Sequence, residues 1–232
     1  MLSHLYQNTV LKNPKSIFVL LLIILLSFGY FSKDFRLDAS SDSLLIEGDP
    51  DLEYLKEINK RYGSKEFLIL TYSPNEGMVT ESSINNLLSL KYKIQSLEWV
   101  HSVVTLLDIP LLNNSEAPLQ ERLEDFKTLK DDTVDTEKGF AEILNSPVFR
   151  NFVISEDGRT SGIIVYIKKD DIEDIKNKSE KEIEIFKDTL KKKNHKNITQ
   201  IREIIKSYDN IGKIYLGGIP MIADDMMSFI KS

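Results

Sequence analysis

The chain has 232 residues, of which 41% are hydrophobic and 28% are charged, so it holds enough apolar side chains to bury the core of one ordinary domain or two small ones. It contains no cysteine, which excludes a disulfide framework, thiolate metal ligands and a cysteine nucleophile. A net charge of −6, from 30 Lys and Arg against 36 Asp and Glu, argues against a nucleic-acid-binding protein.

The first 32 residues differ from the remainder in charge and hydropathy. Their charged residues are Lys12 and Lys15, whereas the remaining 28 basic and 36 acidic residues give a net charge of −8. The 17 residues between Lys15 and Lys33 are uncharged, and as a helix they are about 25 Å long at about 1.5 Å per residue. The hydrocarbon core of a bilayer is about 30 Å thick, and lysines at both ends can reach its interfaces with their long side chains. We therefore predict a transmembrane helix over residues 17–31.

The charges on either side of this helix predict its orientation. Positive charge precedes it, and acidic residues such as Asp34 and Asp38 follow it. By the positive-inside rule, residues 1–16 are then cytoplasmic and the bulk of the chain is extracytoplasmic.

Two other interpretations of the apolar segment stay open. A helix that is apolar on every face can be the buried core helix of a soluble domain. The segment can also belong to a cleaved signal peptide, because Ser27-Phe28-Gly29 places small residues at the positions that a signal peptidase recognises, after an apolar run of ten residues.

From residue 49 onward the hydrophobic pattern predicts alternating helices and strands. A helix begins at Asp49-Pro50 and ends at Gly63. The next elements are a buried strand over residues 66–72, a helix capped near Thr80, and a second strand over residues 99–108. Together the last three form one β-α-β unit.

A second unit is predicted in the later part of the chain. After a proline-containing loop and short helices over residues 119–129 and 136–144, Asp157-Gly158 predicts the turn of a hairpin with strands 151–155 and 160–168. Helices are expected over about 171–193 and 197–208, separated at Asn194-His195, followed by a strand over 212–216. The fold class is therefore α+β, with β-α-β followed by β-β-α-β, which is a ferredoxin-like element order.

The C-terminal residues predict one further helix. Gly217-Gly218-Ile219-Pro220 is a turn that opens this helix, which runs to Lys231-Ser232 without a cap. It is either a helix that continues in a longer protein or a terminal helix that docks on the domain.

Motifs that carry enzymatic chemistry do not occur in the sequence: it has no glycine-rich phosphate loop, HExxH, EF-hand loop or GxSxG. The three histidines (His4, His101 and His195) lie in different settings, so we predict no metal site. We expect solvated surface for Asp131-Asp132, Asp170-Asp171 and Lys191-Lys192-Lys193. Asp224-Asp225 is of more interest, because acids early in a helix interact favourably with its dipole. We predict no catalytic, cofactor-binding or metal-binding residue and no enzyme activity.

Six stretches of the chain stand out together: DFRLDASSDSL (34–44), RYGS (61–64), VVTLLDIPLL (103–112), SP (146–147), SEDGRT (155–160) and GGIPMIADDMMSFI (217–230). In this order they resemble the N-terminal portion of bacterial RND-superfamily exporters of the MMPL-like type, which are related to hopanoid transporters. The last stretch is the most specific of the six.

The resemblance implies an uncleaved transmembrane helix at residues 17–31, an extracytoplasmic (periplasmic) porter-like α/β sandwich domain at about 35–218, and the start of a second membrane helix at 219–232. It implies a transporter of the bacterial inner (cytoplasmic) membrane that exports a hydrophobic or lipid-like substrate, driven by an ion gradient through segments outside these 232 residues. The partners are then membrane lipid, the substrate, the remaining transmembrane helices and further copies in an oligomer. The alternative is a single-pass membrane-anchored, or secreted, extracytoplasmic binding or sensor module.

Overall fold

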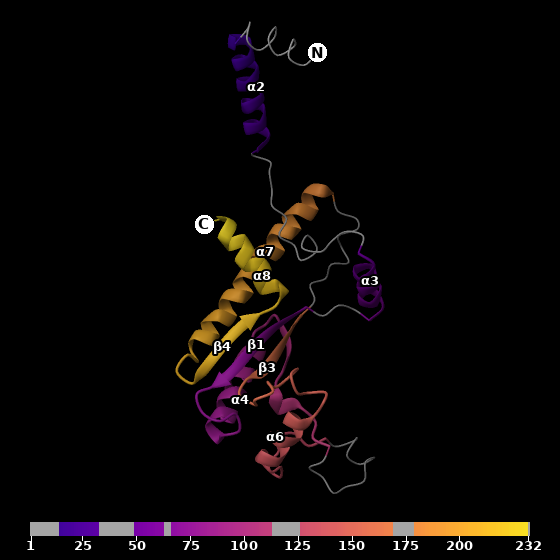
Figure 1. Ribbon diagram of the computed structural model, residues 1–232, viewed down its shortest axis with the longest axis vertical. Coiled ribbons are helices and arrows are strands. Elements are labelled where there is room, and N and C mark those ends of the chain that lie inside the picture. Colours follow the sequence, from indigo (N-terminus) through magenta and orange to yellow (C-terminus); the bar gives the residue numbers. More distant parts are fainter. Residues whose placement is uncertain (1–13, 33–48, 63–65, 113–125, 169–178, 232) are drawn as a thin grey trace. The chain divides into compact units, whose positions relative to one another are not determined.

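The computed structural model describes residues 14–32, 49–62, 66–112, 126–168 and 179–231 (Figure 1). The chain divides into two compact units, residues 1–39 and residues 40–232. Each unit is described by itself.

The first unit contains helix α2 (Pro14–Ser32). It is long and apolar enough to cross a membrane, with a mean hydropathy of 2.1 over an 18-residue window. None of its residues is buried, and its large apolar side chains from Phe18 to Phe31 are 42–75% exposed. Within this unit, the length and apolar character of α2 fit both a membrane anchor and a signal sequence.

The second unit is built on a four-stranded antiparallel sheet. Its strands are β1 (Phe67–Pro74), β2 (Val100–Val104), β3 (Ser161–Ile167) and β4 (Gly212–Gly217), in the order β2-β3-β1-β4. At the centre of the sheet Leu70 of β1 pairs with Ile163 of β3 on one side and Leu216 of β4 on the other. The α+β class is therefore confirmed, and the sheet elements follow one another as β-α-β and β-α-β. The predicted β-β-α-β order of the second unit is wrong, because its first strand does not form.

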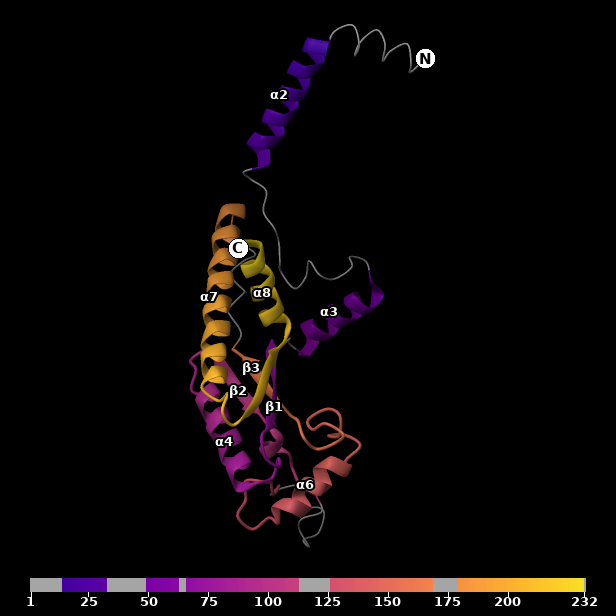
Figure 2. The same ribbon diagram turned by 60° about the vertical axis from the view of Figure 1, so that its left-hand side comes forward.

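Helices α4 (Glu81–Gln95) and α7 (Glu180–Lys206) lie against one face of this sheet (Figure 2). Leu68, Leu70 and Tyr72 alternate along β1 and are fully buried on that face. They pack in one core with apolar side chains of the helices, including Leu87, Leu90, Ile94, Ile198 and Ile201.

The remaining helices are α3 (Pro50–Tyr62), α6 (Thr136–Asn145) and α8 (Ile219–Lys231). The predictions for α3, α6 and the start of α8 are confirmed. The predicted second strand is shorter than expected: β2 ends at Val104, and Leu106–Asp108 form a 3-10 turn, η3. Thr105 caps this turn, because its hydroxyl accepts a hydrogen bond from the Leu107 amide.

The prediction of a first hairpin strand over residues 151–155 is wrong. The amides of residues 152–154 all donate to the Phe149 carbonyl, so the backbone coils there, and Asn151 has a φ of 63°. The predicted turn does form: Gly158 has a φ of 68°, and its amide donates to the Ser155 carbonyl at 2.9 Å. Strand β3 then begins at Ser161.

Two helix predictions also need correction. Residues 180–206 form one continuous helix, so the predicted break at Asn194-His195 is wrong; residues 171–178 lie outside the described part. Of the predicted helix 119–129, residues 119–125 lie outside the described part, and 126–129 are not helical. Lys127 instead forms an isolated β-bridge with Leu111, whose amide donates to the Lys127 carbonyl at 2.8 Å.

Candidate functional site

The two histidines within the described residues lie on different elements. His101 is exposed on β2, His195 lies on α7, and His4 is outside the described residues. Among the described residues, no group of three or more His, Asp or Glu is arranged to hold a metal ion. That the chain has no metal-binding, cofactor-binding or catalytic residue stays a prediction.

The paired acids divide into different roles. Asp131 accepts hydrogen bonds from the Thr128 amide and hydroxyl, at 2.7 and 3.0 Å, and these bonds lower the pKa of its carboxyl. Asp132 is exposed, as expected for solvated surface, and Asp170-Asp171 lies outside the described residues. The Lys191-Lys192-Lys193 run lies on α7, where two of its side chains are exposed and one is half-buried.

Asp224 and Asp225 both contact α7, but by different means. Asp224 is 5% exposed, and its Oδ1 accepts a hydrogen bond from His195 Nδ1 at 2.8 Å. Asp225 is half-exposed and accepts two hydrogen bonds from Arg202, at 2.7 and 2.9 Å. Together with a bond from Asn194 Nδ2 to the Pro220 carbonyl at 2.8 Å, these contacts form a polar connection between the two helices, which we name the α7–α8 seam.

Of the apolar side chains of α8, some pack against the domain and others are exposed. Met221, in its first turn, packs against the core of the domain. Ile222 and Ile230 are each 46% exposed, and Phe229 is 82% exposed. The helix therefore docks by its polar side and its first turn, while apolar side chains further along remain accessible.

Asp108 is the centre of a second polar cluster, which the sequence pattern did not lead us to predict. Its carboxylate accepts bonds from Lys91 and Lys130 and from the backbone and hydroxyl of Thr105. Burial alone would raise the pKa of the Asp108 carboxyl, but the bonds from Lys130, Lys91 and Thr105 outweigh burial and hold it below the ordinary value. The available signal was a T-x-x-D capping pattern, which occurs at Thr105–Asp108 and again at Thr128–Asp131. The connections are internal to the fold, so we assign this cluster to stability.

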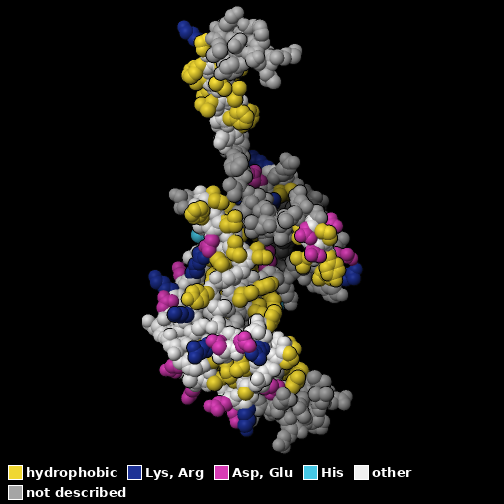
Figure 3. Space-filling view, viewed as in Figure 1, with side chains coloured by type: hydrophobic (Ala, Val, Ile, Leu, Met, Phe, Trp, Pro, Cys, Tyr) yellow, Lys and Arg dark blue, Asp and Glu magenta, His cyan; other side chains and the backbone are white. Residues whose placement is uncertain are grey.

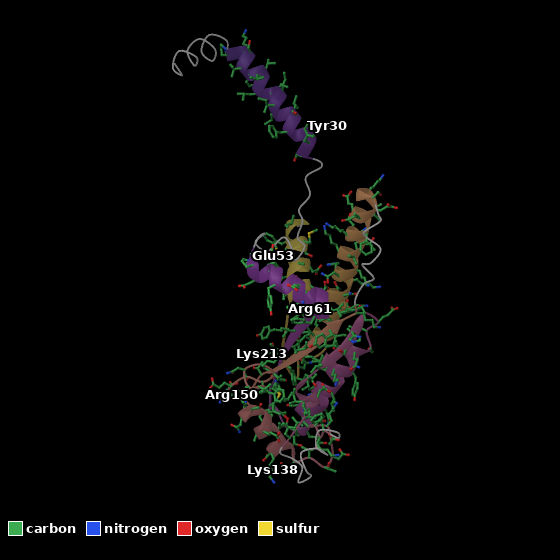
Figure 4. All side chains as sticks on the ribbon, turned by 90° about the vertical axis from the view of Figure 1, so that its right-hand side faces the viewer. Tyr30, Glu53, Arg61, Lys138, Arg150 and Lys213 are labelled. Carbon is green, nitrogen blue, oxygen red and sulfur yellow. The ribbon has the colours of Figure 1, made fainter. Side chains whose placement is uncertain are left out.

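A shallow hollow of about 520 Å³ lies beside α6. Ile143 and Phe149 lie in its wall together with Lys138, which Figure 4 labels, and Glu142. The wall thus combines apolar and charged side chains, which differs from the apolar cleft typical of lipid-like ligands.

The face of the sheet opposite α4 and α7 carries exposed apolar side chains. Phe67 and Ile69 of β1 are 44% and 41% exposed, and Tyr215 of β4 is 64% exposed. Figure 3 shows hydrophobic side chains in this part of the domain and along α2.

No protein-family model matches the chain, and no curated protein sequence is significantly similar to it.

Proposed function

We propose that this chain is the N-terminal part of an RND/MMPL-like transporter of the bacterial inner membrane, which exports a hydrophobic or lipid-like substrate. The observation that carries the proposal is the order of elements: an apolar helix with no buried residue, a ferredoxin-like domain, and a helix that starts directly after the last strand. An extracytoplasmic domain between two membrane helices can transmit movement from the membrane to a substrate path.

The exposure of α8 supports the same proposal. Phe229 and Ile230 lie in its last turn, and an apolar helix end of this kind suits continuation into lipid. In this proposal residues 1–16 are cytoplasmic and residues 35–218 form the porter-like domain.

Topology can be tested by cysteine labelling, because the natural chain contains no cysteine. We compare Ser3→Cys with Thr133→Cys, the latter at an exposed turn position. The proposal expects a membrane-impermeant maleimide to label Thr133→Cys in intact spheroplasts. The same reagent should label Ser3→Cys only after the membrane has been permeabilised. The opposite pattern would contradict the orientation, and recovery of both variants in the soluble fraction would contradict the anchor.

Transport needs its own experiment. Cells that produce the full protein encoded by the gene are loaded with the hydrophobic dye Nile red. Their dye content is compared with that of cells that carry an empty vector. The proposal expects faster dye loss with the protein, abolished by a protonophore, and an apolar segment in the encoded protein shortly after Ser232. Dye retention equal to the control, together with no such segment, contradicts the exporter.

The α7–α8 seam favours a second candidate, a single-pass or secreted extracytoplasmic binding or sensor module, because it docks α8 on the domain. The intact mass of the purified chain tests the secreted form: loss of the residues up to Gly29 indicates signal cleavage, and an intact N-terminus indicates an anchor.

A further inference from the structure

Helix α8 is joined to the sheet through a glycine with an unusual backbone conformation. Gly218 has a φ of 121°, and its carbonyl accepts bonds from the amides of Met221 and Ile222 in the first turn of the helix. A Cβ at this position would lie 3.1 Å from the Phe67 carbonyl oxygen and 3.2 Å from Leu68 Cα. The path from β4 into α8 therefore runs through one residue at which a side chain would be strained.

Beyond this residue, the described polar contacts of α8 with the domain are those of the α7–α8 seam. Arg202 and Asp225 form a bidentate pair with both side chains about half exposed, and the His195 side chain is 63% exposed. When such a contact opens, its groups exchange protein partners for water. The helix can thus separate from α7 without exposing a large apolar core, unlike α4, whose Leu87, Leu90 and Ile94 are buried.

Asp224 opposes this docking. Its Oδ2 is buried, and no donor among the described residues lies within hydrogen-bonding distance of it. A buried carboxylate needs several donors to replace the water that it has lost, and here it has the single bond from His195. On release from α7, both oxygens of Asp224 become hydrated, so this residue favours the open state.

We propose that the α7–α8 seam is a releasable latch: Arg202–Asp225 and Asn194–Pro220 hold α8 closed, the unpartnered oxygen of Asp224 favours opening, and Gly218 is the hinge. The latch itself holds for either function proposed above. Its role as the connection between a membrane helix and the domain rests on the transporter proposal.

The test measures hydrogen exchange of α8 amides (residues 222–230) in the full chain purified in lipid nanodiscs. Asp224→Asn keeps the shape and the acceptor for His195 but removes the buried charge, so we expect roughly three- to tenfold slower exchange in α8. Arg202→Gln removes the bidentate pair, so we expect exchange in α8 to be faster by a few-fold. The matched control is Arg150→Gln, which breaks the exposed Arg150–Glu156 pair away from α8 and leaves α8 exchange unchanged.

The two seam variants give opposite results if the latch is real. If Asp224 is an ordinary stabilising residue, Asp224→Asn speeds exchange or leaves it unchanged, and the proposal is overturned. Unchanged exchange in Arg202→Gln also overturns it. Amides of β1 are the internal reference, and a loss of protection there in Asp224→Asn counts against the latch, because a residue that favours opening cannot be required for the sheet. These readouts do not depend on transport, so the latch and the transporter can fail separately.

Discussion

Lys130 and Asp108 lie 22 residues apart and are joined by a hydrogen bond of 2.8 Å from Nζ to Oδ1. The bond connects two turns of the same T-x-x-D pattern, one after β2 and one ahead of α6. Lys91 of α4 binds the same Asp108 oxygen and is 8% exposed as a whole residue, so three separate segments meet at one carboxylate. Ion pairs that are largely removed from water cost much more to break than surface pairs.

Asp108→Asn is therefore expected to destabilise the domain by about 2 to 3 kcal/mol, since it leaves two lysines without their counter-charge. For a domain of this size the midpoint of thermal unfolding should fall by on the order of 5–10 °C. Trp99, the one tryptophan in the chain, is 8% exposed, and its Nε1 donates to Gln200 at 2.8 Å, so its fluorescence reports unfolding. Asp132→Asn is the control, and an equal loss in both variants would contradict the assignment.

The same cluster predicts acid sensitivity. Because the pKa of Asp108 is lower in the folded chain than in an unfolded chain, its contribution is fully present above the unfolded value of about 3.9 and is lost as pH falls through the folded value. Asp131, Asp135 and Asp157 also have lowered pKa values and act in the same direction. We expect the stability gap between the natural chain and Asp108→Asn to stay constant above about pH 4 and to shrink as the pH falls further, measured by Trp99 fluorescence. A gap independent of pH would refute this.

Gly218→Ala should be costly at the β4–α8 junction, by about 1 to 3 kcal/mol, because the φ of 121° is unfavourable for alanine and the new methyl group meets the β1 backbone. The expected result is a lower unfolding midpoint and faster hydrogen exchange at the start of α8. Gly77→Ala is the matched control, since the nearest atom to its Cβ is Thr80 Cγ2 at 3.6 Å. Equal stability of the two variants would show that the junction is not constrained.

Leu22→Arg tests the membrane anchor, because Leu22 lies near the middle of α2. An arginine at the centre of a membrane helix costs about 2.5 to 3.5 kcal/mol in insertion. We expect the fraction of chain that resists extraction with alkaline carbonate to fall, whereas Leu22→Ile should leave it unchanged. Full retention of Leu22→Arg in the carbonate-resistant fraction would argue that α2 does not span the bilayer.

Two of the wrong predictions have identifiable physical causes. Residues 151–155 have strand-forming side chains, but the amides of residues 152–154 bind the Phe149 carbonyl, so that only an isolated bridge from Ile154 to Ser161 joins this segment to β3. Asn194 and His195 are typical of helix ends, yet α7 continues through them because their side chains bind α8, 26 and 29 residues away. A partner that far along the chain leaves no mark on the local pattern.

The amino-acid pattern was sufficient for the features that neighbouring residues decide: the apolar helix α2, the alternation along β1, and the Thr80 cap of α4, whose hydroxyl accepts from the Ser83 amide. Strand order, the α7–α8 seam and the ion pairs of Asp108 required the tertiary structure. Local propensity acts over a few consecutive residues, whereas each of these contacts depends on which distant segments the packed core brings together.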